Sequence, residues 1–348
     1  MSKRESLIKQ VENDLKSKMS PGESRHELKA DGSDRGKITS WTTFRTYLKH
    51  LIYFVKFIKD HPQVIADLGR KPRMLEECKP YCNLWIDHMK SKSESPSTIS
   101  MCASALVKLF QSSREELGIK ELVPKQLRKN IKRSRRLATR DKNFNEALPR
   151  NKTLATFCRS TGLRRKELSN IRGSDLVKIG NLWYLSVTCE TKGGRPRLSE
   201  IVGTDEEIKM VVDMCKKAGS EKIYSHPNTN ADIHGFRADY AKRVYEKHAR
   251  PRNAYRNERI IVHNNKIVEV YVSKDGKADV EGHKMYYTGK LTKKGTREMI
   301  RGYSDVPTAV FCRLDKKGVS YDRQALFVAS ENLGHSRDDV IVDHYLWS

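Results

Sequence analysis

The chain has 348 residues, which is enough for two domains with separate hydrophobic cores. It carries 68 lysine and arginine residues against 43 acidic ones, a net charge of +25 shared by both halves, which favours nucleic acid as the partner. No apolar run fits a transmembrane helix or a signal peptide, so we expect no membrane partner and a cytoplasmic protein, associated with the nucleoid if bacterial. Seven scattered cysteines suit reduced thiols, and we predict no metal site and no cofactor.

Helical periodicity dominates the first 140 residues. Residues 5–19 read as a short amphipathic helix, which we assign to an N-terminal helical arm, 1–36. Residues 37–140 show four helical patterns and no strand pattern, which predicts a compact helical domain. The first of these helices covers Trp41–Asp60 behind a serine or threonine cap. The others are expected at 75–90, after Ser95 and after Pro124.

The helix after Pro124 should be strongly basic. Like charges on one helical face repel each other by a few tenths of a kcal/mol per pair. A phosphate backbone alongside would remove this repulsion and release counterions, so we predict that the helix contacts DNA, with a solvated helix face as the alternative. Its cations recur at i, i+3 and i+4 spacing and are Lys125, Arg128, Lys129, Lys132, Arg133, Arg136 and Arg140.

A polar segment, 141–151, contains Pro149 as a predicted stop and is interpreted as the linker to a second domain, 152–348. The second domain alternates helical and strand patterns. Within it, 254–320 has strand-like runs and glycine- and lysine-rich turns, which indicate a β-rich insertion. The fold class is therefore mainly α with a small β-sheet. Helices are expected at 152–160, from 167, at 205–218, at 236–249 and at 321–332, and paired strands at 182–187 and 198–202.

An ordered set of polar residues crosses this second domain. Two arginines, Arg164 and Arg237, offer forked donors that match phosphate and stay charged at any working pH. A late tyrosine, Tyr345, can serve as a nucleophile if a neutral histidine takes its proton. We expect His234 to be this base and His335 to donate to a phosphate oxygen. The remaining lysine, Lys192 in a predicted hairpin turn, can protonate a leaving 5′ oxygen, so the set suits cleavage of a DNA phosphodiester without metal.

The order and local context of these residues resemble the tyrosine recombinase (phage integrase) family over roughly residues 38–348. The first arginine stands in Thr161–Leu168, and Glu167 matches the acidic position that supports this arginine in the family. His234-Gly235-Phe236-Arg237 matches the family's His-x-x-Arg motif, and Leu333-Gly334-His335 matches its Leu-Gly-His motif.

The resemblance implies a helical core-binding domain followed by an α+β catalytic domain. It implies a site-specific recombinase that cuts and rejoins double-stranded DNA through a 3′-phosphotyrosyl intermediate and a Holliday junction. A homodimer would bind each recombination site and a tetramer would form the synapse. The protein would act in DNA integration, excision or transposition of a mobile element, with an accessory DNA-bending or excision factor as a further partner.

Two features depart from the family pattern. The tyrosine lies one residue later than usual because His344 occupies its usual place, and the insertion 254–320 separates Arg237 from His335. Two other functions remain open. A type IB topoisomerase shares the same catalytic residue types but relaxes any supercoiled DNA, and a non-catalytic DNA-binding protein could keep the same fold.

Overall fold

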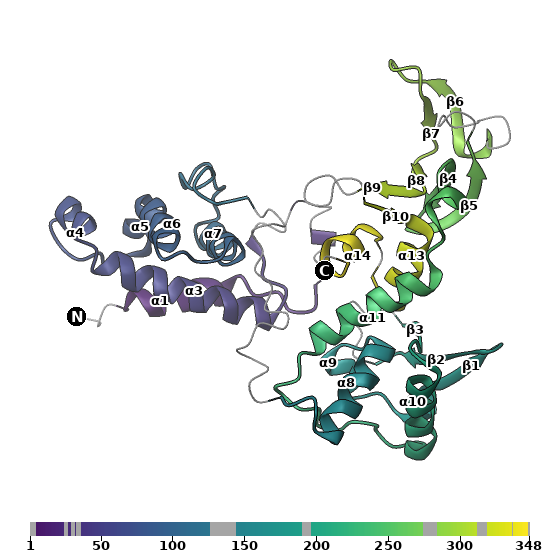
Figure 1. Cartoon of the computed structure of the whole chain (residues 1–348). Coiled ribbons are helices and arrows are strands. Elements are labelled where there is room, and N and C mark those ends of the chain that lie inside the picture. The colour runs from purple at the N-terminus through teal and green to yellow at the C-terminus, as the bar shows by residue number, and fades with distance from the viewer. Residues whose placement is uncertain are drawn as a thin grey trace. The chain divides into compact units, whose positions relative to one another are not determined.

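The computed structural model describes residues 5–23, 27–28, 32, 36–125, 144–189, 196–273, 284–311, 319–335 and 337–346. The chain divides into two compact units, Met1–Arg133 (unit 1) and Ser134–Ser348 (unit 2), which are described separately (Figure 1). Within the described ranges, no helix combines the length and the apolar character needed to cross a membrane.

The regular elements in the described residues of unit 1 are helices, apart from one isolated β-bridge. Ser6, Ser40 and Ser95 start three of its helices, and each side chain accepts a hydrogen bond from the backbone N–H three residues later. The predicted helix at 75–90 is divided, because Pro80 falls in a 3₁₀ turn at Lys79–Tyr81. The helices are α1 (Leu7–Ser17), α3 (Trp41–Lys59), α4 (Pro62–Leu68), α5 (Leu75–Cys78), α6 (Cys82–Ser91) and α7 (Pro96–Phe110).

The helix α1 belongs to the core of unit 1. Leu7, Val11 and Leu15 are buried in the same apolar cluster as residues of α3, α6 and α7. A parallel bridge between Met19 and Ile38 further connects the segment after α1 to the start of α3. The expectation of a separate helical arm at 1–36 is therefore wrong for α1, because three apolar side chains at helical spacing are buried within this unit. The predicted basic helix after Pro124 lies outside the described residues from 126 onward.

Unit 2 combines helices with small antiparallel sheets. Pro149 does not stop a helix but occupies the first turn of α8, where its missing N–H costs nothing. The first sheet has the order β1-β2-β3, and β2 and β3 are the strands predicted on either side of the hairpin turn. The elements up to α12 are α8 (Pro149–Thr161), α9 (Arg165–Leu168), β1 (Leu176–Ile179), β2 (Leu182–Val187), β3 (Arg197–Glu200), α10 (Asp205–Ala218), α11 (Ile233–His248) and α12 (Arg252–Tyr255).

The long helix α11 lies at the centre of unit 2, where it packs against α8 and against α13 (Arg323–Asn332). Its start is fixed by Asp232, whose side chain accepts a hydrogen bond from the Gly235 N–H at 3.0 Å. On its buried face, the ring of Tyr240 fills the space beside Gly162, the residue that ends α8 at a φ of +61°. A Cβ atom at Gly162 would lie 2.1 Å from that ring, so only glycine lets these two helices approach so closely.

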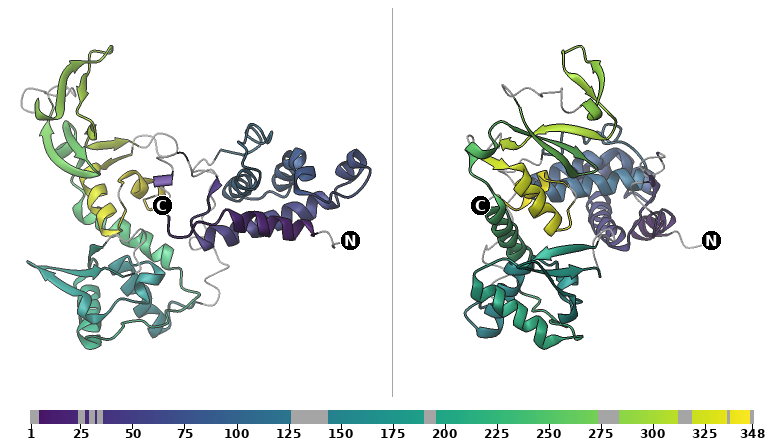
Figure 2. Two further views of the ribbon diagram at one scale, coloured as in Figure 1. Left: turned by 180° about the vertical axis from the view of Figure 1, so that it is seen from behind. Right: turned by 90° about the vertical axis from the view of Figure 1, so that its right-hand side faces the viewer.

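The strand content predicted for 254–320 is present in the structure. One sheet has the order β5-β4-β8, and two further strand pairs, β6-β7 and β9-β10, complete the segment. Figures 1 and 2 show β6 and β7 projecting from the helices of unit 2. A tight turn at Asn264 and Asn265, both with positive φ, joins β4 to β5. The strands are β4 (Glu258–His263), β5 (Lys266–Val272), β6 (Tyr287–Leu291), β7 (Arg297–Met299), β8 (Tyr303–Pro307), β9 (Ala309–Phe311) and β10 (Ser320–Asp322).

Ion pairs join the insertion to the helices of unit 2. Arg250, just after α11, lies 2.8 Å from Glu258 at the start of β4 and 2.8 Å from Asp322 at the end of β10. Asp322 is fully buried and also caps α13, through a hydrogen bond from the Gln324 N–H. The two ends of the insertion are thus held together, at the end of α11, by the ion pairs of Arg250.

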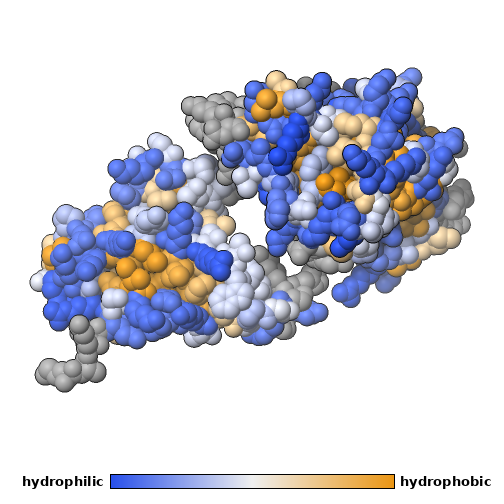
Figure 3. All heavy atoms as spheres, turned by 90° about the horizontal axis from the view of Figure 1, so that it is seen from below, coloured by the Kyte–Doolittle hydropathy of each residue, from blue (hydrophilic) through white to orange (hydrophobic). Residues whose placement is uncertain are grey.

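The surface reflects the composition. Hydrophilic residues cover most of the face seen in Figure 3, and a patch of apolar residues lies on unit 1. Exposed apolar side chains of α1 and α3 include Ile8, Trp41 and Tyr53.

Candidate active site

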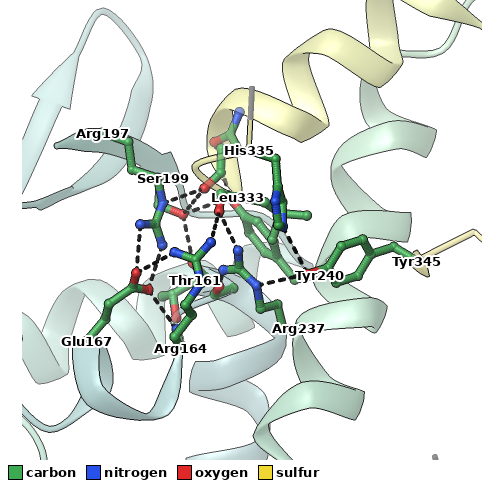
Figure 4. Close-up of polar contacts among 12 residues, drawn as sticks. Thr161, Arg164, Glu167, Arg197, Ser199, Arg237, Tyr240, Leu333, His335 and Tyr345 are labelled. Carbon is green, nitrogen blue, oxygen red and sulfur yellow. Dashed lines mark hydrogen bonds and ion pairs between the residues drawn. The ribbon is translucent and has the colours of Figure 1, made fainter. Parts of the chain in front are cut away.

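The first arginine of the site stands at the start of a one-turn helix. Arg164 precedes α9, and its backbone N–H and its guanidinium Nη1 both donate to the Glu167 carboxylate, each at 2.7 Å. The other terminal nitrogen, Nη2, donates to the Leu333 carbonyl at 3.1 Å. Arg164 is thereby held at both ends of its side chain, as Figure 4 shows.

The carboxylate of Glu167 lies between two arginines. Its side chain is fully buried, and it also accepts two hydrogen bonds from Arg197, at 3.0 and 2.7 Å. Burial alone would raise the pKa of Glu167, but the bonds from Arg197 and Arg164 outweigh it and lower the pKa to about 2. Glu167 is therefore ionised at any working pH.

The second arginine, Arg237, is buried on α11 with only 1% of its surface exposed. Its terminal nitrogens donate to the carbonyls of Gly162 and Leu333, and its Nε lies 3.4 Å from the Tyr345 hydroxyl. Burial lowers the pKa of Arg237 to about 10, which leaves the guanidinium charged at neutral pH.

The histidine and the tyrosine near the C-terminus meet beside Arg237. Gly334, at a φ of +62°, turns the chain after α13, and His335 follows. Tyr345 ends α14 (Asp339–His344) and is 7% exposed, and its hydroxyl lies 3.0 Å from His335 Nε2. Burial, followed by the charges of nearby arginines and His344, lowers the pKa of His335 to about 4. A neutral imidazole protonated at Nδ1 can accept the hydrogen bond from Tyr345.

Three guanidinium groups converge on the C-terminal end of α13. Arg197 Nε donates to the Asn332 carbonyl at 2.9 Å, while Arg164 and Arg237 both donate to the Leu333 carbonyl. These carbonyls form the negative end of the helix dipole. With Glu167 as the carboxylate in this contact set, the cluster keeps an excess of positive charge, which suits a phosphate group.

A buried polar network lies behind the arginines. Ser199 on β3 donates to the Thr161 carbonyl at 2.7 Å, and the Tyr240 hydroxyl donates to the Glu200 carbonyl at 2.8 Å. The Asn332 side-chain oxygen accepts from the Glu200 N–H at 2.6 Å. This network fixes the end of α13, and hence the Leu333 carbonyl, against β3, an outer strand of its sheet.

Unit 2 thus brings together five of the predicted site residues: Arg164, Glu167, Arg237, His335 and Tyr345. His234, the expected base, is an exposed residue of the first turn of α11. Lys192 lies outside the described residues, as do all the predicted DNA-binding cations from 128 to 140. Lys125 is described and exposed. In the described part of the chain, no group of three or more histidine, cysteine or acidic side chains could hold a metal ion.

Arg197 was not assigned a role in the sequence analysis, although it ends the predicted hairpin turn. Its contacts are with residues 30 and 135 positions away in the chain. The one local signal is an arginine at a strand position that alternates inward, where an unpaired charge would not be tolerated.

A second feature that the sequence analysis missed is an exposed stripe on α3 in unit 1. Its members follow one another at spacings of four or three residues, so they share one helical face. Trp41 and Tyr53 are 56% and 51% exposed, and α3 contains no acidic residue. Cations interleaved with exposed aromatic rings are typical of nucleic-acid-binding surfaces. The α3 stripe consists of Trp41, Arg45, Lys49, Tyr53 and Lys56.

Among solved structures, the chain is similar to a Tn1549 transposon integrase in complex with circular intermediate DNA. The identity is 14%, the TM-score is 0.35, and 72% of this chain and 90% of that one are covered. A complex of the same integrase with transposon right end DNA gives 14% identity, a TM-score of 0.36 and coverage of 71% and 89%. The XerA recombinase gives 16% identity, a TM-score of 0.24 and coverage of 69% and 85%.

The names of these structures agree with the family that the motifs resemble. No protein-family model and no curated protein matches the chain.

Proposed function

We propose that the protein is a site-specific DNA recombinase that cuts and rejoins DNA through a covalent tyrosine intermediate, integrating or excising a mobile element. The observation that carries the proposal is the position of the Tyr345 hydroxyl. It lies within hydrogen-bond distance of a neutral histidine, His335, and beside the buried guanidinium of Arg237. A nucleophile, a base that can take its proton and a group that binds phosphate are therefore adjacent.

In the proposed reaction, the Tyr345 oxygen attacks the phosphorus of a DNA phosphodiester and forms a 3′-phosphotyrosyl bond. His335 Nε2 takes the phenol proton as the bond to the 5′ oxygen breaks. Arg164 and Arg237 stabilise the charge on the non-bridging oxygens, and each such donor is worth roughly 3–4 kcal/mol of barrier. Lys192 protonates the leaving 5′ oxygen, as the hairpin position predicts. Attack of a second 5′ hydroxyl on the phosphotyrosine reverses these steps and rejoins the strands.

This mechanism assigns the base differently from the sequence analysis. His335, rather than His234, is 3.0 Å from the Tyr345 hydroxyl, and its lowered pKa keeps it unprotonated at neutral pH. His234 is an exposed residue of α11, and we assign it no part in the proton transfer.

Double-stranded DNA is the proposed partner. The net charge of +25 and the α3 stripe, with its exposed cations and rings, support contact with a duplex by unit 1. By family resemblance, two copies bind each recombination site and four form the synapse, in which strands exchange through a Holliday junction.

The proposal is tested by looking for a covalent adduct. The protein is incubated without metal with supercoiled plasmid that carries the DNA flanking its own gene, and a protein–DNA band is sought on a denaturing gel. We expect the wild type to form this adduct and Tyr345→Phe to form none. Tyr321→Phe is the matched control, because its hydroxyl donates to the Leu346 carbonyl in the same apolar cluster.

Each outcome has a distinct meaning. An adduct that needs the flanking DNA supports a recombinase, whereas an adduct on any plasmid would favour the topoisomerase function. An adduct that survives in Tyr345→Phe would refute the choice of nucleophile. DNA binding by the wild type with no adduct under any condition would favour a non-catalytic DNA-binding protein.

A further inference from the structure

Glu167 holds two guanidinium groups at once, and only one of them belongs to the predicted phosphate-binding pair. Arg197 makes a two-pronged contact with the carboxylate, at 3.0 and 2.7 Å. Its third contact, from Nε to the Asn332 carbonyl, is 2.9 Å long. The side chain of Arg197 is only 5% exposed, compared with 20% for Arg164. Arg197 is therefore committed to protein groups, while Arg164 keeps more of its side chain accessible to a ligand.

The carboxylate determines where Arg164 points. Glu167 receives the backbone N–H and the Nη1 of Arg164, so it fixes both the turn and the guanidinium. A buried carboxylate keeps this role only while it is ionised, because the protonated form loses the ionic part of each bond. The groups that face it are Arg164 from its own turn and Arg197 from β3. Arg237 from α11 is joined to Arg164 through the Leu333 carbonyl, and His335 follows in the same turn.

We propose that Arg197 is a positioning residue that keeps Glu167 ionised and thereby holds Arg164 in the orientation that binds the scissile phosphate. The inference rests on the proposed function, because the phosphate is the substrate of that function. Arg197 also ties β3, the strand that follows the Lys192 turn, to the end of α13. The position of the hairpin and the orientation of Arg164 are thus connected through one side chain.

The test uses a measurement that a purely structural role would leave unchanged. In the wild type, Glu167 stays ionised well below neutral pH. Its protonation therefore causes no fall in the cleavage rate as the pH decreases from 8 to 5.5 (an acid limb). In Arg197→Gln, burial is opposed by the contacts of Arg164 alone, so we expect the pKa of Glu167 to rise. We expect single-turnover cleavage at pH 8 to fall up to about 100-fold because of the misplaced guanidinium. We further expect the rate of Arg197→Gln to decline between pH 8 and pH 5.5 while the wild-type rate stays flat.

Three further variants separate the possible causes. Arg197→Lys keeps the positive charge but lacks the paired donors of a guanidinium group. Compared with Arg197→Gln, it should show the flat pH profile of the wild type and recover only part of the cleavage rate. The double variant with Glu167→Gln and Arg197→Gln has no carboxylate at position 167, so the fall in cleavage rate at low pH should disappear. If the fall persists, its cause is the protonation of His335 and the inference is wrong. Arg243→Gln is the matched control, since it removes another two-pronged pair, with Glu207 at 2.7 and 3.1 Å. It should cleave within about twofold of the wild type.

A measurement without DNA separates this inference from the proposed function. The Glu167 carboxyl carbon is followed by NMR and identified by its loss in Glu167→Gln. It should not titrate between pH 4 and 8 in the wild type, and it should titrate in Arg197→Gln. If the carboxyl titrates in the variant but the wild type never forms an adduct, the proposed function fails and the control of Glu167 by Arg197 stands. A carboxyl that does not titrate in folded Arg197→Gln, or wild-type cleavage by that variant, overturns the inference.

Discussion

The lowered pKa of His335 predicts a specific dependence of stability on pH. The folded protein holds this imidazole at a pKa of about 4, below the ordinary value of 6.5, because burial and the nearby Arg237 disfavour its charged form. The unfolded chain therefore binds the proton more readily than the folded protein. Stability contributed by the neutral imidazole is fully present above about pH 7, and it is lost as the pH falls towards 4.

The loss of free energy of unfolding follows from the pKa of His335 in the folded protein and in the unfolded chain. At pH 5 the whole shift would correspond to a loss of roughly 2 kcal/mol relative to pH 8. Because the imidazole is only half-buried, solvent screening reduces this to about 1 kcal/mol. Such a loss is a measurable fraction of the stability of a protein domain.

The assay is urea denaturation of the wild type and of His335→Gln at pH 8 and at pH 5. Other titrating groups affect both proteins alike, so the comparison is between the two pH-dependent losses. We expect the loss from pH 8 to pH 5 to be about 1 kcal/mol smaller in His335→Gln. Equal losses in the two proteins, or a larger loss in the variant, would refute the assignment of a neutral, desolvated imidazole at this position.

Two further predictions concern the helices. Gly162→Ala should lower the free energy of unfolding by at least about 3 kcal/mol in thermal or urea denaturation, because its positive φ and the aromatic ring packed against it both oppose a Cβ. Gly180→Ala, at a similar φ but with open space around it, should lose only about 1 kcal/mol, and similar losses at the two sites would contradict the packing argument. Arg45→Ala and Lys49→Ala on the α3 stripe should each weaken DNA binding and reduce the slope of log affinity against log salt by about 1, as measured by fluorescence anisotropy. The exposed Lys90 on α6 is the control, and an equal effect of Lys90→Ala would mean that the stripe has no special role.

Local patterns were sufficient to predict most elements of the fold. The helices around Trp41 and after Asp205, and the strands that flank the hairpin turn, follow from apolar periodicity and capping residues. Pro149 was misinterpreted because proline is compatible both with the end of one element and with the first turn of a helix. The arm at 1–36 was misjudged because an amphipathic pattern does not identify the surface that covers its apolar face.

The motifs contain five side chains that lie together in unit 2, but sequence order does not show which of them are in contact. Sequence spacing provides two histidines, and only the fold reveals which one lies next to the Tyr345 hydroxyl. Arg197 could not be found in this way, since its role depends on Glu167 and Asn332, which are distant in the chain. Contacts of this range are decided by tertiary packing, which periodicity does not encode.

The Leu333 carbonyl competes for the donors of the proposed phosphate-binding site. Two of the guanidinium groups that we assign to the phosphate already donate to this one backbone oxygen, at the negative end of α13. In the proposed function, a DNA phosphate would enter by exchange: the Leu333 carbonyl would lose hydrogen bonds from the arginines as a phosphate oxygen gained them. The net free energy of binding at this point is the difference between hydrogen bonds to a charged phosphate oxygen and hydrogen bonds to a peptide carbonyl. We expect this difference to be small for an isolated anion. A DNA duplex would add further contacts along its length. We therefore expect the α13 terminus to favour an extended DNA duplex over small anions in the proposed function.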